Sequence, residues 1–94
     1  MTRVPSLPRG VRIHDDRVRG VPVLLGPERA LILDDIGAAI LAEVDGARTI
    51  DSITDRLAAL YNAPRDEIAG DVLAFLDDLQ VQRLLDYAPV TPHG

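Results

Sequence analysis

The chain has 94 residues, a hydrophobic content of 47% and no cysteine, and its 15 acidic and 10 basic residues give a net charge of −5. A chain of this length forms one small core, which excludes a large multidomain enzyme, and the absence of cysteine excludes disulfides, thiolate metal sites and Cys nucleophiles. The acidic balance disfavours nucleic acid and anionic membrane surfaces as partners, because both carry negative charge.

The first predicted elements along the chain are three short strands. The strands are predicted at residues 11–14, 21–25 and 30–33, where apolar residues alternate with polar ones or are β-branched and turn residues lie between the segments. Residues 17–20 are expected to join the first two strands as a loop. Residues 26–29, Gly-Pro-Glu-Arg, are expected to join the second and third as a tight hairpin.

Three helices are predicted next, because the hydrophobic period changes from two to about 3.6 residues. Asp34 or Asp35 is expected to cap the first helix, and Thr49 to cap the second. Pro64 lies where the third helix should begin. The apolar faces that should pack on a common core are Ile36, Ala39, Ile40 and Val44, then Ile50, Ile53, Leu57 and Leu60, then Ile68, Val72, Phe75, Leu76 and Leu79.

Strands followed by helices predict an α+β fold, a three-stranded antiparallel β-sheet followed by a three-helix bundle in a winged helix-turn-helix-like layout. Residues 1–10 are expected to be a flexible segment, residues 11–87 the folded domain and residues 88–94 a disordered tail, with 84–87 as a last extended piece. The chain start lacks the apolar stretch of a signal peptide, so we expect a cytoplasmic protein.

The sequence offers no catalytic or metal-binding constellation. His14 is followed by Asp15 and Asp16, but neighbouring residues on a strand point to opposite faces. The adjacent pairs 34–35 and 77–78 also diverge, by about 100° on a helix, and capping or solvation explains them. We therefore expect no enzyme activity, no metal and no cofactor, unless a pocket joins His14 to buried carboxylates.

DNA recognition is disfavoured by the third helix, which would be the reading helix of such a fold. Near its start it offers one basic side chain, Arg65, against the acidic side chains of Asp66, Glu67 and Asp71. Base edges and phosphates require basic or amide side chains at these positions. The sequence therefore favours protein or peptide recognition over nucleic acid binding.

The remaining candidate site is the third strand beside the third helix. If residues 30–34 form an edge strand, its unpaired N–H and C=O groups can pair with an extended peptide, and a groove against the helix would hold side chains. In a second interpretation the apolar side chains are simply core, and one strand can serve both roles. The side chains in question are Leu31, Leu33, Val72, Phe75, Leu76 and Leu79.

Three stretches have an order and spacing typical of a known family. They are Leu24-Leu25-Gly26-Pro27-Glu28-Arg29-Ala30-Leu31-Ile32-Leu33-Asp34, Asp45-Gly46-Ala47-Arg48-Thr49-Ile50 and Asp71-Val72-Leu73-Ala74-Phe75-Leu76. The chain resembles the PqqD family of pyrroloquinoline quinone (PQQ) biosynthesis from about residue 11 to residue 85. The resemblance implies a non-catalytic peptide chaperone, of the type called a RiPP recognition element, that binds the precursor peptide PqqA and delivers it to the radical-SAM enzyme PqqE.

The resemblance also implies where the peptide binds, namely beside the third strand and against the third helix. An alternative function on the same scaffold is an acidic winged-helix interaction or regulatory module that forms a homodimer by self-pairing of edge strands. The peptide-binding residues implied in this chain are Ala30, Leu31, Ile32, Leu33 and Asp34 on the strand, and Ala69, Val72, Leu73 and Leu76 on the helix.

Two residues depart from the family pattern, both outside this groove. Pro22 stands where relatives usually carry Trp, and because it has no N–H we expect it at an edge or a bulge of the sheet. Arg83 stands where relatives have Gly at the end of the third helix. Without glycine for a left-handed cap, the helix is expected to run on.

Overall fold

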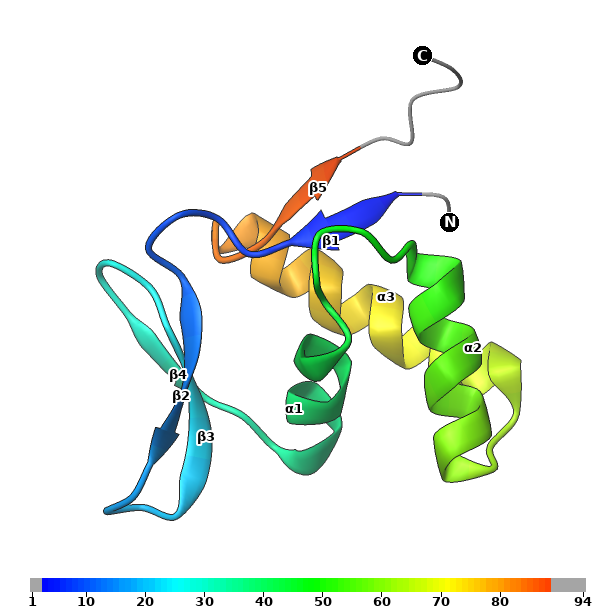
Figure 1. The fold of residues 1–94 in the computed structure, drawn as a ribbon, viewed down its shortest axis with the longest axis horizontal. Helices are drawn as coiled ribbons and strands as arrows, with labels where there is room; N and C mark the ends of the chain where they lie inside the picture. Colours follow the sequence, from blue (N-terminus) through cyan, green and yellow to red (C-terminus); the bar gives the residue numbers. More distant parts are fainter. Residues whose placement is uncertain (1–2, 89–94) are drawn as a thin grey trace.

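The computed structural model describes residues 3–88. A three-stranded antiparallel sheet stands at one side, the three helices lie together on one side of this sheet, and a two-stranded sheet lies above the helices (Figure 1). This architecture confirms the predicted α+β fold. In chain order the elements are β1 (Val4–Ser6), β2 (Arg12–Asp16), β3 (Val21–Leu25), β4 (Ala30–Ile32), α1 (Asp35–Ala42), α2 (Ile50–Tyr61), α3 (Arg65–Val81) and β5 (Asp86–Ala88).

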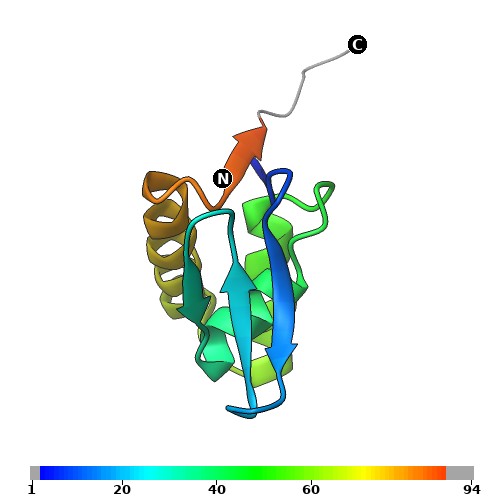
Figure 2. The same ribbon diagram turned by 90° about the vertical axis from the view of Figure 1, so that its left-hand side faces the viewer.

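The main sheet has the strand order β2-β3-β4, so β3 is central and β4 lies at an edge (Figure 2). Both predicted hairpins are present, and the second closes with a hydrogen bond from the N–H of Gly26 to the carbonyl of Arg29 at 2.8 Å. β4 is short, with its last ladder pair at Ile32 opposite Val23. The prediction of an edge strand after the hairpin is confirmed.

Pro22 lies in the central strand, so the expectation of an edge or a bulge is wrong. Its carbonyl accepts a hydrogen bond from the N–H of Leu33 at 3.0 Å. The N–H and C=O of one strand residue point to the same side, so the N–H that proline lacks would also point toward β4. Because proline has no N–H, Pro22 and Leu33 form one hydrogen bond instead of two, and the regular ladder of β4 ends at Ile32.

The predicted helix starts are confirmed by their capping contacts. The Asp34 carboxylate accepts a hydrogen bond from the N–H of Gly37 at 2.7 Å, and the Thr49 hydroxyl accepts one from Ser52 at 3.1 Å. Each satisfies a helix N–H that has no partner inside the helix. Pro64 directly precedes the first residue of α3, where its missing N–H costs nothing.

The end of α3 departs from the sequence prediction, because the helix stops before Arg83. That residue takes φ of 63°, in the left-handed region. The N–H of Leu84 donates to the carbonyl of Leu79 and the N–H of Arg83 to that of Gln80, both at 2.9 Å, which completes a Schellman motif. Leu84 and Leu85 are 2% and 1% exposed. We infer that the turn persists without glycine because their burial outweighs the conformational cost.

The sequence predicts a flexible segment over residues 1–10, but the structure places a strand inside it. β1 pairs antiparallel with β5 from the other end of the chain. The ring of Pro5 is fully buried, and the N–H of Ile50 donates to the carbonyl of Arg3 at 3.0 Å. Pairing and burial therefore correct the expectation for residues 4–6, and the fold includes residues before position 11.

Tyr87 attaches β5 to α3. Its hydroxyl donates to the Asp77 carboxylate at 2.7 Å, and the Arg3 guanidinium lies 4.0 Å from the centre of its ring. Burial and the Asp77 hydrogen bond raise the pKa of Tyr87 above its ordinary value of 10.0. Ala88, predicted to open the tail, belongs to β5, and residues 89–94 lie outside the described residues.

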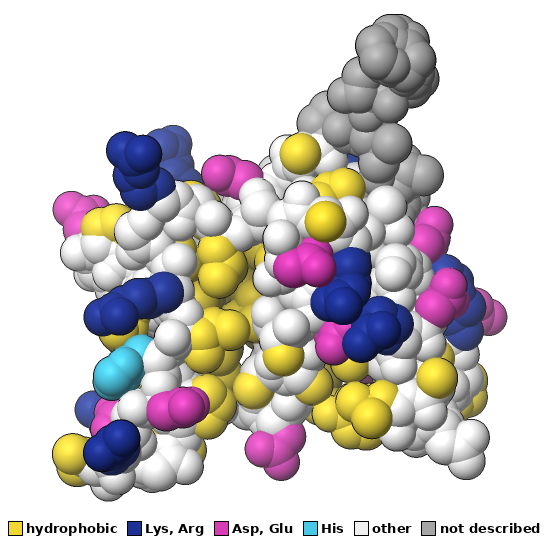
Figure 3. Space-filling view, viewed as in Figure 1, with side chains coloured by type: hydrophobic (Ala, Val, Ile, Leu, Met, Phe, Trp, Pro, Cys, Tyr) yellow, Lys and Arg dark blue, Asp and Glu magenta, His cyan; other side chains and the backbone are white. Residues whose placement is uncertain are grey.

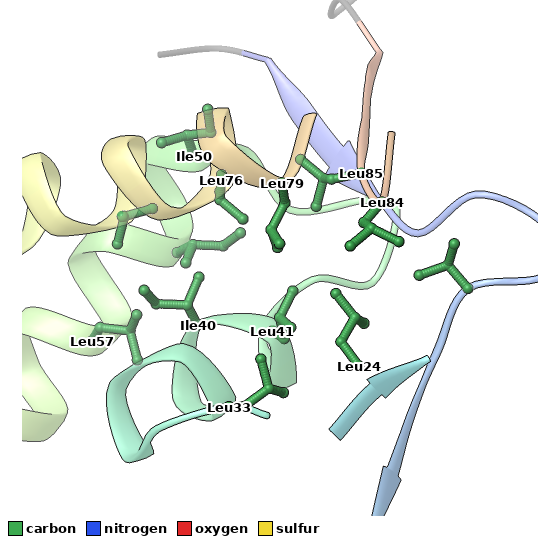
Figure 4. Packing of buried hydrophobic residues seen from close by; sticks show 13 residues of the cluster. Leu24, Leu33, Ile40, Leu41, Ile50, Leu57, Leu76, Leu79, Leu84 and Leu85 are labelled. Atoms are coloured by element: carbon green, nitrogen blue, oxygen red, sulfur yellow. The ribbon is translucent and has the colours of Figure 1, made fainter. Parts of the chain in front are cut away.

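The core lies between the inner face of the sheet and the helices. Leu24 and Leu33, from the sheet side, lie beside Leu41 of α1, and Leu79 and Leu84 from the end of α3 complete this region (Figure 4). A space-filling view shows apolar side chains gathered between the sheet and the helices (Figure 3). No helix in the described part of the chain is long and apolar enough to cross a membrane.

Candidate functional site

A cleft of about 250 Å³ lies between the edge strand and α3. β4 and the residues that follow it form one wall, and the second half of α3 forms the other. The walls consist of Leu31, Ile32, Leu33 and Asp34 on the strand side, and Phe75, Asp78, Leu79 and Gln82 on the helix side.

The backbone of β4 faces this cleft with groups that the sheet does not use. Leu33 points its N–H toward Pro22 on β3, and alternation along the strand turns the N–H and C=O of Ile32 and Ala30 the opposite way. Within residues 3–88, β4 has no ladder partner on that side. These groups can pair with an additional extended chain.

The α1 end of the cleft depends on a glycine. A Cβ on Gly37 would lie 3.0 Å from the Phe75 ring and 3.0 Å from the carboxylate of Asp34. Glycine therefore lets the Phe75 ring and the capping carboxylate approach the start of α1 together. The result is an apolar ring and an acidic group side by side at this end of the cleft.

At the opposite end, side-chain hydrogen bonds connect the β3–β4 loop to α3. The Arg29 guanidinium donates to the Gln82 amide oxygen at 3.0 Å, and the Gln82 amide nitrogen donates to Asp78 at 2.9 Å. This chain of three side chains runs from the loop onto the helix wall. It lines the cleft with polar groups where β4 begins.

The predicted strand residues lie largely where expected. Leu31, Ile32, Leu33 and Asp34 all line the cleft. Ala30 is exposed at the start of β4 but is not part of the wall, so it can contribute only through its backbone.

The predicted helix residues lie elsewhere. Val72 and Leu76 are 0% exposed in the core, which is what the core interpretation expects. Ala69 and Leu73 are partly buried but do not line the cleft. Leu73 and Phe75 are about 160° apart around the helix axis, because two positions turn the helix by about 200°.

The sequence did not indicate Asp78 and Gln82 as site residues, and it left Phe75 and Leu79 open between groove and core, outside the predicted peptide-binding residues. These four follow the i, i+3, i+4, i+7 spacing of one helix face. The signal was present, but half of this stripe is polar, so apolar periodicity could not select it.

The sequence matches the family model described as coenzyme PQQ synthesis protein D (PqqD) over residues 23–85. The chain belongs to the PqqD family. It is 49% identical over 83 residues to the "PqqA binding protein" of Rhizobium meliloti (strain 1021), covering 88% of this chain and 85% of that protein. The matched region includes β4, the cleft and all three helices.

Solved PqqD structures share this fold. The solution structure of the PqqD truncation of Methylobacterium extorquens PqqCD, described as a stand-alone RiPP recognition element, matches with a TM-score of 0.77 and 44% identity over 88% of each chain. The crystal structure of PqqD from Xanthomonas campestris matches with a TM-score of 0.60 and 40% identity, over 86% of this chain and 90% of that one.

Proposed function

We propose that this chain binds the precursor peptide PqqA by strand addition to β4 and presents it to the radical-SAM enzyme PqqE, without catalysing a reaction itself. The open edge of β4 beside the cleft is the observation that carries this proposal. Membership of the PqqD family, and the name of the R. meliloti relative as a PqqA binding protein, support the identity of the peptide.

In the proposed complex, the backbone of Ile32 exchanges hydrogen bonds with an extended segment of the peptide. Peptide side chains alternate along that segment, so every second one points into the cleft toward Phe75 and Leu79. Backbone pairing supplies affinity, and the apolar and polar wall of α3 supplies selectivity. The side chains of Ala69 and Leu73 do not line the cleft, so the proposed contact does not use them.

Presentation to PqqE is the second part of the proposal. A chaperone that holds the peptide and also docks on the enzyme raises the effective concentration of the peptide at the active site. The rate at which PqqE modifies PqqA at low peptide concentration should therefore rise when this chain is added. A variant that no longer binds the peptide should lose this effect.

Ile32→Pro tests strand addition, because it removes the outward N–H of Ile32 while the β3–β4 ladder uses the groups of Leu31 and Leu33. The matched control is Ile32→Ala, which shortens the same side chain and keeps the N–H. In calorimetric titrations with synthetic PqqA, we expect Ile32→Pro to bind roughly three- to tenfold more weakly than Ile32→Ala. Equal affinities of the two variants, both folded by circular dichroism, would exclude strand addition.

The alternative function is a homodimer in which the same edge pairs with β4 of a second copy. Sedimentation with and without PqqA separates the two cases. One peptide bound per monomer supports strand addition. A stable dimer that does not bind PqqA and that Ile32→Pro converts to monomer would replace the proposal with self-pairing.

A further inference from the structure

The cleft is lined by acidic side chains, and the cleft that adjoins it beyond Gln82 is lined by two arginines. Asp34 and Asp78 line the first cleft beside α1 and in the middle of the α3 wall. Beyond Gln82 it continues into an adjoining cleft of about 230 Å³, whose lining includes Arg29 and Arg83. Gln82 lines both clefts, so an extended chain that leaves the start of β4 passes from the acidic part to the basic part.

The two arginines at the basic end are not neutralised. Within residues 3–88 neither Arg29 nor Arg83 forms an ion pair, whereas five other arginines do. The side-chain partner of Arg29 is the neutral amide of Gln82. Glu28 lines the same cleft but pairs with neither arginine, which leaves two positive charges against one negative charge in the lining.

A carboxylate is a better partner for these guanidinium groups than the Gln82 amide. A carboxylate carries the opposite charge and has two oxygens, so it can accept two parallel guanidinium hydrogen bonds, whereas the Gln82 amide offers one neutral oxygen. Arg29 can turn from Gln82 to such a ligand because both lie at the same cleft wall. Gln82 would then keep its bond to Asp78.

We propose that Arg29 and Arg83 bind the carboxylate of an acidic residue that flanks the strand-forming segment of the bound peptide. This subsite rests on the proposed function, since it extends the path of a peptide paired with β4. An acidic side chain at the α1 end would face Asp34, and the like charge there disfavours that placement. The charge asymmetry therefore selects one direction and register of the peptide.

The direction of the peptide follows from the position of its acidic residue. β4 runs away from Arg29, starting at Ala30. A peptide antiparallel to β4 runs toward Arg29 and carries the acidic residue on the C-terminal side of its paired segment. A parallel peptide carries it on the N-terminal side.

Two variants and one control test the subsite with synthetic PqqA as the titrant. Arg29→Gln removes one charge, and Arg83→Gly removes the other while placing glycine where φ is 63°. Arg17→Gln removes a charge that has no ion pair within residues 3–88 and lies in the β2–β3 loop, at the far end of the sheet. We expect about two- to fivefold weaker binding for each of the first two variants, less at high salt, and unchanged binding for the control.

Amide variants of the peptide identify the ligand. Each Glu or Asp of PqqA is replaced in turn by Gln or Asn, and one replacement should weaken binding and abolish the further effect of Arg29→Gln. If Arg29→Gln and Arg83→Gly bind as tightly as Arg17→Gln while the parent still binds PqqA, the subsite is refuted and strand addition stands. If the parent does not bind PqqA at all, the proposed function fails and the subsite fails with it.

Discussion

Replacing Arg83 by glycine should stabilise this fold. Arg83 holds φ of 63° in the Schellman turn that ends α3. The left-handed conformation destabilises a residue with a Cβ by about 1–2 kcal/mol, whereas glycine adopts it without this strain. Glycine loses more conformational entropy on folding, which offsets about 0.4–1 kcal/mol of this gain in stability.

The side chain of Arg83 contributes little to the balance. It is exposed, and within residues 3–88 it forms neither an ion pair nor a side-chain hydrogen bond. We therefore expect Arg83→Gly to raise the free energy of unfolding by roughly 0.5–1 kcal/mol. For a domain of this size, that corresponds to an increase in Tm of about 2–8 °C.

Thermal and urea unfolding followed by circular dichroism measure this effect. Arg83→Ala is the matched control, because it removes the same side chain but keeps the Cβ that makes the conformation costly. The alanine variant should be no more stable than the parent protein. If glycine gives no gain over alanine, the left-handed residue is not under strain and the explanation for the end of α3 is incorrect.

Two further predictions concern the polar side chains of Thr54 and Tyr87. The Thr54 hydroxyl is buried without a hydrogen-bond partner among the described residues. Thr54→Val should therefore raise the free energy of unfolding, measured by urea titration, by about 1 kcal/mol. A lower free energy of unfolding in this variant would mean that the hydroxyl is paired. Burial and the hydrogen bond to Asp77 raise the pKa of Tyr87, so the folded state favours the protonated hydroxyl. The stability that this preference contributes is complete below the ordinary pKa of 10.0 and declines as the pH rises above it. Tyr87→Phe should therefore lose less stability than the parent protein between neutral pH and about pH 10.5, and equal losses would contradict this linkage.

One wall of the cleft could be predicted from the sequence and the other could not. The edge position of β4 follows from a hairpin loop and the helix that comes directly after it, so the strand wall could be predicted. The helix wall could not, because α3 has apolar residues on more than one flank. Val72 and Leu76 point into the core, whereas Phe75 and Gln82 form the wall of the cleft. Gly37 lets α1 pack closely against the Phe75 ring, and this packing decides which flank of α3 faces β4.

The sequence by itself determined the local elements of this protein: the hairpin at residues 26–29, the caps at Asp34 and Thr49, and the start of α3 after Pro64. Each depends on groups within a few residues of one another, so short-range hydrogen bonding and fixed backbone angles are sufficient to specify it. Only the tertiary structure decided the β1–β5 pair and the end of α3. β1 finds its partner at the opposite end of the chain, and Arg83 adopts a left-handed conformation because Leu84 and Leu85 must enter the core.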